Sequence, residues 1–281
     1  MSEPVVPTSG ARPLAGVRSV IAVGAGKGGV GKSTVAALLA VGLRRKGRKA
    51  ALLDADVYGP SLPRITGTEG AQPGVSEDGF IIPPEKDGIP VLSIGYFLPP
   101  EQAVIWRGPM AQKYVKELLE RGQWGQLDCL VVDLPPGTGD IPLTLAQTIP
   151  LTGAVIVCTP QELALADAIK ALRMYQKLGV EPLGMIENMS YYICPKCGHR
   201  EDVFAHGGVE AAARRLEVPF LGAIPLNTTI RRHGDQGALS ESFTQTEPSL
   251  VAALEQIVER LIEQLERRLA QAAPPPRLSI E

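Results

Sequence analysis

The stretch GAGKGGVGKSTV, residues 24–35, decides the fold of this chain. Gly26 and Gly31 occupy the glycine positions of the pattern G-x-x-x-x-G-K-S. An apolar strand precedes the pattern and a helix follows it, so backbone N–H groups and the helix dipole converge on phosphate oxygens. We therefore predict a phosphate loop in which Lys32 neutralises the β and γ phosphate oxygens and Ser33 Oγ binds Mg²⁺.

Apolar runs alternate with helical patterns along the chain around this loop. The runs are SVIAVGA, AALLDAD, LDCLVVDLP, GAVIVCT, PLGMIENM and PFLGAIP. They are continuously apolar rather than alternating, which indicates strands that are buried on both faces. The sequence therefore predicts an α/β fold, in which a mostly parallel twisted sheet is flanked by helices on both faces.

The chain divides into one predicted domain between two short segments. Residues 1–16 are rich in Pro, Ser and Gly and predict a flexible N-terminal arm, and 272–281 predict a flexible tail. Between them, 17–271 predict a single P-loop ATPase domain with a C-x-x-C loop near 190–207. Apolar residues at helical spacing predict a C-terminal helix over 247–271, which packs on the body or on a partner.

Residues 76–95 hold two short apolar runs on either side of PPEKDG, a stretch of turn residues. This pattern is typical of a hairpin. We expect this hairpin to decorate the sheet.

The composition argues against a nucleic-acid-binding protein and against a membrane protein. Lys plus Arg number 28 and Asp plus Glu number 30, so the net charge of −2 favours neither nucleic acid nor an anionic membrane as a partner. We see no signal peptide and no apolar run of about 18 residues, the length of a membrane span. We therefore expect a cytoplasmic protein.

Aspartates follow two of the predicted strands. Asp133 ends the run CLVVD and fits the metal-binding carboxylate of a P-loop protein, and the LPPGTGD loop that begins beside it fits a sensor of the γ phosphate. Asp54 and Asp56 end a second strand at the same edge. One can support the magnesium shell while the other positions the attacking water, and we assign these roles to Asp54 and Asp56 respectively. The alternative for Asp56 is that it caps a turn.

A second lysine, Lys27, lies inside the phosphate loop. Lys32 already serves the phosphates of its own loop, so a second cation there is redundant unless it reaches a nucleotide in a facing subunit, as an arginine finger does. This reasoning predicts a nucleotide-bound homodimer. The alternative is a solvated loop lysine.

A cysteine pair, Cys194 and Cys197, forms the pattern C-P-x-C-G, a tight knuckle that suits zinc or iron. Two thiolates are too few for such a metal site. A second copy of the chain across a two-fold axis would supply two more. Cys129 and Cys158 lie in predicted buried strands and are poor candidates to complete the site.

Two other interpretations of the cysteine pair stay open. His199 and His206 are near enough in sequence to complete a zinc site with the thiolates. A redox pair is the third possibility, disfavoured because the cysteines do not start a helix after a thioredoxin-like strand.

The chain resembles the Mrp/ApbC branch of the deviant Walker A ATPases, which are relatives of the MinD and ParA proteins. The resemblance extends from about residue 18 to about 240 and is carried by six motifs that occur in the same order. The motifs are GKGGVGKST, DADVYGPS, WRGPM at 106–110, DLPPGTGD, ENMS at 187–190 and CPKCG at 194–198. The resemblance implies a P-loop NTPase fold of the SIMIBI type that uses ATP, and the chain has no N-K-x-D motif for guanine.

The resemblance also implies roles for individual residues. Lys27 would contact the nucleotide of the facing subunit, and Asn188 would contact the adenine edge, as an amide at a strand end can; capping of a turn is the alternative for Asn188. The segment IPLN at 224–227 would wall the base. The cysteine pair of each subunit would hold a bridging [4Fe-4S] cluster, with zinc possible in its place. The family's separate N-terminal domain and its N-terminal four-cysteine motif are not found, so we expect a single cluster site.

The sequence thus predicts an ATP-hydrolysing homodimer that carries an iron-sulfur cluster to apoprotein clients. The alternatives are a partitioning or positioning ATPase of the MinD/ParA type, and a zinc-stabilised, ATP-switched scaffold. The predicted catalytic residues are Lys27, Lys32 and Asp56. The predicted magnesium ligands are Ser33, Asp54 and Asp133. The residues predicted to contact the nucleotide are Gly26, Lys27, Gly28, Gly29, Val30, Gly31, Lys32, Ser33, Thr34, Asn188 and Pro225.

Overall fold

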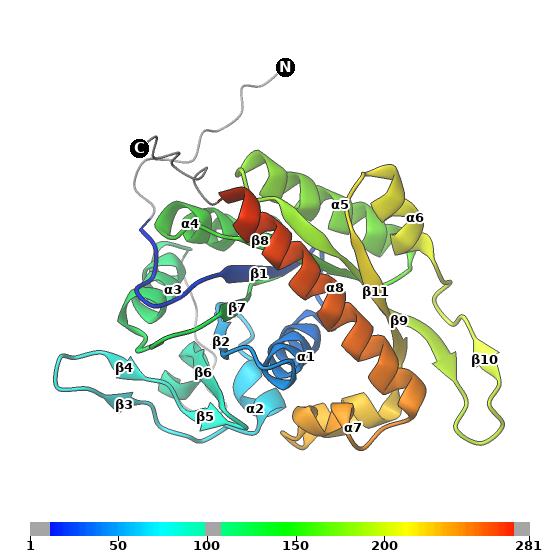
Figure 1. The fold of residues 1–281 in the computed structure, drawn as a ribbon, viewed down its shortest axis with the longest axis horizontal. Coiled ribbons are helices and arrows are strands. Elements are labelled where there is room, and N and C mark those ends of the chain that lie inside the picture. The colour runs from blue at the N-terminus through cyan, green and yellow to red at the C-terminus, as the bar shows by residue number, and fades with distance from the viewer. Residues whose placement is uncertain (1–11, 99–107, 273–281) are drawn as a thin grey trace, which may run out of the picture.

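The computed structural model describes residues 12–98 and 108–272, which form one α/β body around a twisted sheet (Figure 1). Residues 1–11, 99–107 and 273–281 lie outside the described part. Most of the predicted N-terminal arm, nearly all of the predicted tail and the first two residues of WRGPM are therefore outside it.

The central sheet is mostly parallel, as predicted. Its strand order is β10-β9-β8-β1-β7-β2-β6-β5, and β11 pairs in parallel with β9. In the described residues, the antiparallel pairings of this sheet are those of the two-residue strands β5 and β10. The strands are β1 (Val20–Ala25), β2 (Ala50–Asp54), β5 (Glu85–Lys86), β6 (Ile89–Ser93), β7 (Cys129–Asp133), β8 (Gly153–Cys158), β9 (Pro182–Ile193), β10 (Arg200–Glu201) and β11 (Phe220–Leu226).

Helices cover both faces of the sheet and account for the continuous apolar strands. One core cluster lies under α1, α7 and α8, and the other under α3, α4, α5 and α6. Every residue of β1, β2, β7 and β8 is buried between them. The helices are α1 (Lys32–Arg45), α2 (Leu62–Thr66), α3 (Gly108–Arg121), α4 (Asp140–Thr148), α5 (Glu162–Lys177), α6 (Gly208–Arg215), α7 (Thr228–Asp235) and α8 (Pro248–Ala272).

The stretch 76–95 differs from the predicted decorating hairpin. Its second apolar run is β6, which pairs in parallel with β2 and belongs to the central sheet. Val91 and Leu92 in this run are fully buried, which explains why it joins the core. The turn at Asp87 and Gly88 has positive φ at both residues, as a tight two-residue hairpin turn requires, and joins β6 to β5. A separate two-stranded hairpin is formed by β3 (Gly74–Val75) and β4 (Ile81–Ile82).

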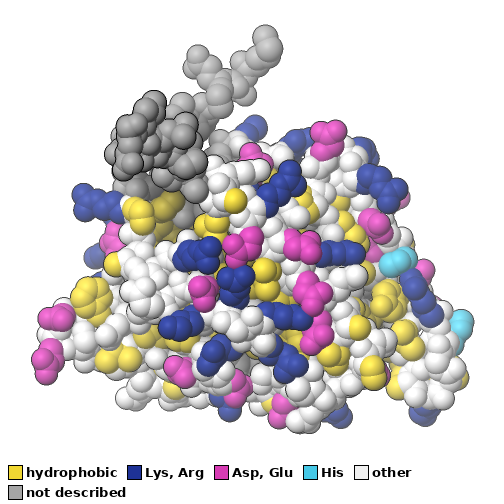
Figure 2. Space-filling model, in the orientation of Figure 1, with side chains coloured by type: hydrophobic (Ala, Val, Ile, Leu, Met, Phe, Trp, Pro, Cys, Tyr) yellow, Lys and Arg dark blue, Asp and Glu magenta, His cyan; other side chains and the backbone are white. Residues whose placement is uncertain are grey.

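The predicted C-terminal helix is α8, and it packs on the body. Its apolar stripe, which includes Leu254, Val258 and Leu261, is buried in the same cluster as α1. Lys46 at the end of α1 pairs with Glu259 of α8 at 2.6 Å. Figure 2 shows Lys and Arg interspersed with Asp and Glu over the face that α8 crosses, without a large patch of one sign. Among the helices of the described residues, none is both long enough and apolar enough to cross a bilayer.

The contact between α1 and α8 depends on a small residue, Gly42. A Cβ built there would lie 2.2 Å from Val258 Cγ2, closer than real side chains approach. We expect Gly42→Ala to lower the free energy of unfolding by about 1–3 kcal/mol, because the added methyl overpacks this contact. Urea denaturation measures the change.

Gly234→Ala in α7 is the matched control, because the nearest atom to its Cβ, Leu239 Cδ1, is 4.0 Å away. Alanine has the higher helix propensity, so this variant should be neutral or stabilising by up to about 1 kcal/mol. Equal unfolding midpoints for the two variants would contradict close packing at Gly42.

Candidate functional site

The phosphate loop joins the carboxyl end of β1 to the first turn of α1, as predicted. Gly31 precedes α1 with φ of 80°, a left-handed conformation that favours glycine, and a Cβ there would lie 2.3 Å from Asn188 Nδ2. A Cβ at Gly26 would lie 2.1 Å from the backbone of Asp167 in α5. The glycines therefore let the loop pass between α5 and β9.

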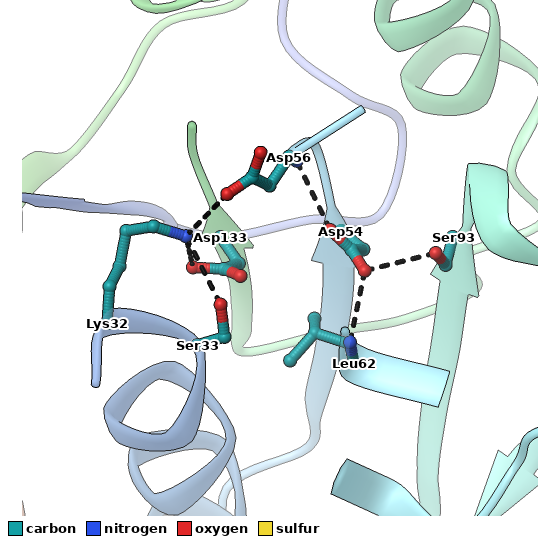
Figure 3. A network of polar contacts seen from close by, with 7 residues as sticks. All are labelled: Lys32, Ser33, Asp54, Asp56, Leu62, Ser93 and Asp133. Carbon is teal, nitrogen blue, oxygen red and sulfur yellow. Dashed lines mark hydrogen bonds and ion pairs between the residues drawn. The ribbon is translucent and has the colours of Figure 1, made fainter. Parts of the chain in front are cut away.

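Lys32 reaches from the start of α1 into a cluster of carboxylates (Figure 3). Its Nζ lies 2.5 Å from Asp133 Oδ1 and 3.3 Å from Asp56 Oδ2, and it donates to Ser33 Oγ at 3.3 Å. The Lys32 side chain is only 6% exposed. Three residues predicted from separate motifs, Lys32, Asp56 and Asp133, are thus in direct contact.

Asp54 lies beside this cluster but faces away from Lys32 (Figure 3). Its Oδ2 accepts hydrogen bonds from the backbone N–H of Leu62 and from Ser93 Oγ, both at 3.1 Å. Its Oδ1 accepts from the backbone N–H of Asp56 at 3.2 Å, so it fixes the loop that carries the second aspartate. Direct magnesium binding by Asp54 stays a prediction, and these contacts favour a supporting role.

The donor set around Lys32 fits a divalent cation. Burial raises the pKa values of Asp133 and Asp56, and burial together with the nearby Asp133 raises the pKa of Asp54 to about 8. Lys32 contacts two of these carboxylates, Asp133 and Asp56, and a bound cation would favour the ionised form of both. Asp133 Oδ2 is buried and has no hydrogen-bond partner among the described residues. Carboxylate and hydroxyl oxygens are the ligands that Mg²⁺ prefers, so Asp133 with Ser33 fits magnesium.

A pocket of about 400 Å³ adjoins the phosphate loop and brings four predicted nucleotide residues together. These four are Gly31, Thr34, Asn188 and Pro225. The rest of the IPLN segment that was predicted to wall the base, Ile224, Leu226 and Asn227, also lines the pocket. The lining residues that the sequence analysis missed are Leu38, Met189, Tyr192, Thr228, Ile230 and Arg231. Most of these flank the ENMS or IPLN motifs or begin α7, so proximity to a predicted motif was the available signal. A larger hollow of about 510 Å³ lies near the amino ends of β1 and β8, at the opposite edge of the sheet.

Asn188 does not end its strand, contrary to the prediction. β9 continues to Ile193, with an irregularity at Met189, whose φ is 54°. Asn188 Nδ2 donates to the carbonyl of Val30 at 2.8 Å, which is the capping role kept as the alternative. The same side chain lines the pocket, so capping of the loop and contact with a base are compatible.

The other predicted residues of the phosphate loop differ in their exposure. Lys27 is partly exposed, Gly28 and Gly29 are exposed, and Val30 is buried. The reach of Lys27 into a facing subunit depends on a second chain and stays a prediction.

The cysteine pair lies on a loop between β9 and β10. The backbone N–H of Cys194 donates to the carbonyl of His199, and that of Gly198 donates to the carbonyl of Cys194, both at 2.9 Å. Hydrogen bonds from the backbone N–H groups of Cys197 and Lys196 lower the pKa of the Cys194 thiol. The loop therefore has the predicted knuckle geometry, which stabilises a thiolate.

The remaining cysteines and the histidines do not complete this site in the described part of the chain. Cys129 and Cys158 are buried in β7 and β8, and burial raises their pKa values. His206 contacts Ser190 rather than the cysteine pair. Within the described residues, no group of three or more Cys, His, Asp or Glu side chains is arranged to hold a metal. Further ligands for the cysteine pair would have to come from outside these residues.

Comparison with known proteins identifies the family. Residues 16–262 match the family described as ParA: NUBPL iron-transfer P-loop NTPase. The chain is 45% identical to the iron-sulfur cluster carrier protein of Escherichia coli (strain K12) over 250 residues, which cover 89% of this chain and 68% of that protein. It is 50% identical to the iron-sulfur cluster carrier protein of Aquifex aeolicus (strain VF5) over 227 residues, 80% of this chain and 62% of that protein. This chain therefore spans about two thirds of the length of these relatives.

A solved structure of a nucleotide-binding protein is similar to this chain in both sequence and fold. The nucleotide-binding protein of Archaeoglobus fulgidus in complex with ADP has a TM-score of 0.71 and 41% identity to this chain, covering 80% of this chain and 88% of that one. The family match extends over most of the chain and includes the phosphate loop, the aspartates around Lys32 and the cysteine pair. This chain belongs to the ParA family of NUBPL-type iron-transfer P-loop NTPases.

Proposed function

We propose that this chain is an ATP-hydrolysing homodimer that holds a bridging [4Fe-4S] cluster between its subunits and transfers the cluster to apoproteins. The observation that carries the proposal is the exposed knuckle of Cys194 and Cys197. It offers two thiolates, and the described residues supply no others nearby. A second copy related by a two-fold axis would complete a four-thiolate set. The relatives named as iron-sulfur cluster carriers support this cargo.

The residues around Lys32 suit the hydrolysis of ATP. Water attacks the γ phosphorus, the bond to the oxygen that bridges the β and γ phosphates breaks, and ADP and phosphate leave. Asp56, whose Oδ2 lies 3.3 Å from Lys32 Nζ, would orient this water and take its proton. Lys32, and Lys27 from the facing subunit, would neutralise the charge that develops on the phosphate oxygens. Bound Mg²⁺ would add positive charge at the β and γ oxygens.

Each predicted magnesium ligand has a distinct place in this scheme. Ser33 and Asp133 lie next to Lys32 and would hold the cation. Asp54 would act through the loop whose backbone it fixes.

The pocket beside the phosphate loop suits the adenine of ATP. It is mostly apolar, with an amide at Asn188 that can exchange hydrogen bonds with a purine edge. Pro225 lies on β11 against β9 and forms part of the wall. We infer that the base lies here with its phosphates directed along the loop toward Lys32.

The cargo and the thiols suit a reducing compartment, and we place the protein in the cytoplasm for that reason. Its clients would be apoproteins that lack their cluster. Neither the net charge of −2 nor the mixed-charge face over α8 favours nucleic acid or a membrane, so a partitioning role is the weaker candidate.

The first test concerns hydrolysis. We expect Asp56→Asn to lower kcat for ATP by about 100-fold or more, because it removes the base that takes the proton of water. The affinity for ATP should stay within about threefold of wild type, since the contacts with phosphate are unchanged. Steady-state phosphate release and equilibrium nucleotide binding measure the two effects.

Asp78→Asn, on the exposed turn between β3 and β4, is the control for loss of one carboxylate and should behave as wild type. Unchanged turnover in Asp56→Asn would remove Asp56 from the mechanism.

The second test concerns the cargo. After anaerobic reconstitution we expect about four iron and four sulfide per wild-type dimer, with a broad thiolate-to-iron absorption band. Substituting both Cys194 and Cys197 by Ser should abolish this loading and leave ATP affinity unchanged. Cys129→Ser, at a buried thiol, should load as wild type does.

Full occupancy in the double variant would refute the cysteine assignment. Zinc that iron does not displace in the wild type would instead identify the knuckle as a structural zinc site on an ATP-switched scaffold.

A further inference from the structure

A buried carboxylate, Glu187, lies where the cysteine-bearing segment leaves the body and where it returns. We call this segment, residues 190–207, the cysteine arm. Glu187 Oε1 accepts from Ser190 Oγ at 2.5 Å at the start of the arm, and from the backbone N–H of Gly207 at 2.9 Å at its end. Its Oε2 accepts from the backbone N–H of Val209 in α6 at 2.9 Å. One fully buried side chain therefore holds both ends of the arm against the body. We call these hydrogen bonds of Glu187 the tie.

His206 completes this tie from the returning end of the arm. Its Nδ1 lies 2.6 Å from Ser190 Oγ and 3.2 Å from Glu187 Oε1. Ser190 has one hydroxyl proton and donates it to Glu187, so it accepts from the Nδ1–H of His206. The His206 ring also meets Tyr191 edge-on, with centroids 5.7 Å apart, and the guanidinium of Arg200 lies 4.2 Å from the centroid of Tyr191. The tie thus continues along the arm to β10.

The residue next to Glu187 belongs to the nucleotide site. Asn188 donates to the Val30 carbonyl of the phosphate loop at 2.8 Å and lines the base pocket. Met189, which also lines this pocket, has φ of 54°, and Ala205 at the other end of the arm has φ of 69°. Positive φ is uncommon and strained for residues with a side chain, and such strain persists where the surroundings enforce it. A strained residue therefore lies beside the tie at each end of the arm, Met189 at the start and Ala205 at the end.

We propose that Glu187 is a positioning residue that makes the placement of the cysteine arm depend on the state of the base pocket. Ser190 and His206 are its side-chain contacts on the arm. A nucleotide that contacts Asn188 or shifts the Val30 carbonyl moves the backbone that also carries Glu187, and the tie passes this shift to both ends of the arm. The inference rests on the proposed function, because it takes ATP as the ligand of the pocket and metal cargo as the reason to move the arm.

The test measures the exposure of the arm in the reduced, metal-free protein. Iodoacetamide alkylation of Cys194 is followed by mass spectrometry with and without Mg²⁺ and an ATP analogue that resists hydrolysis. In the wild type we expect the nucleotide to change the alkylation rate by about fivefold or more. His206→Ala should reduce this change to less than about twofold while the nucleotide still binds, because the arm loses one of its ties.

Two conservative variants separate positioning from folding. His206→Asn keeps an N–H donor that can reach Ser190 in place of Nδ1–H, and should restore the nucleotide response. Glu187→Gln should lose the response. Both oxygens of Glu187 accept hydrogen bonds, and the NH₂ group of glutamine would replace one of these acceptors with a donor. His199→Ala, at an exposed position on the same arm, should respond as wild type does. Low reactivity of the buried Cys129 and Cys158 shows that each variant is folded.

Two results would overturn the inference: a wild-type rate that bound nucleotide leaves unchanged, or a full response in folded His206→Ala. Neither result depends on iron or sulfide. A chain that never loads a cluster can still show the nucleotide response, and a chain that loads one can still lack it. The outcome for Glu187 is therefore distinct from the outcome for the proposed cargo.

Discussion

The buried contact between Lys32 and Asp133 is the interaction on which the rest of the site depends. The parallel register places Asp133 opposite both Asp54 and Val23. β2 and β7 therefore end together, and β1 continues past them to Ala25, which brings the phosphate loop beside the carboxylates. Loss of one partner from a buried ion pair typically costs about 3–5 kcal/mol. A phosphate that draws Lys32 toward itself therefore leaves Asp133 in need of another cation. In the proposed mechanism, this requirement would link nucleotide binding to the binding of magnesium.

β9 connects this site with the cysteine pair. It pairs with β8 and β11 inside the body and extends to β10 in the arm, so one strand of 12 residues contributes to both regions (Figure 1). Asn188 contacts the phosphate loop from this strand, and the adjacent Glu187 holds the arm. Coupling between distant sites needs a physical element that both sites can bias. The two regions here share backbone, so no long chain of intermediate contacts is required.

The sequence predicts the features that depend on local pattern. The phosphate loop follows from the spacing of Gly26 to Ser33, and the carboxylate cluster follows because parallel strands end at one edge of the sheet. The sequence predicts a decorating hairpin over 76–95 instead of strand β6 in the central sheet, because a run as short as IPVLS does not reveal its partner strand. The tie at Glu187 joins residues about 20 positions apart, and its one local signal is a charged residue within the apolar run PLGMIENM. Met and Ala usually adopt negative φ, so residue type gives no signal for the positive φ of Met189 and Ala205.

In the proposed carrier, the ligands of the cluster are divided between two chains, and this division links cluster binding to dimer formation. When each subunit supplies two thiolates, cluster binding and subunit association become parts of one equilibrium, and whatever shifts one shifts the other. Cys197 is exposed and Cys194 is partly exposed, so in the proposed carrier the thiolates of an acceptor would be able to approach the bound metal and replace those of the carrier. Tight retention would call for buried ligands from one chain, as in structural zinc sites. Exposed ligands on an arm that can be repositioned instead favour release, which is what delivery to an apoprotein requires.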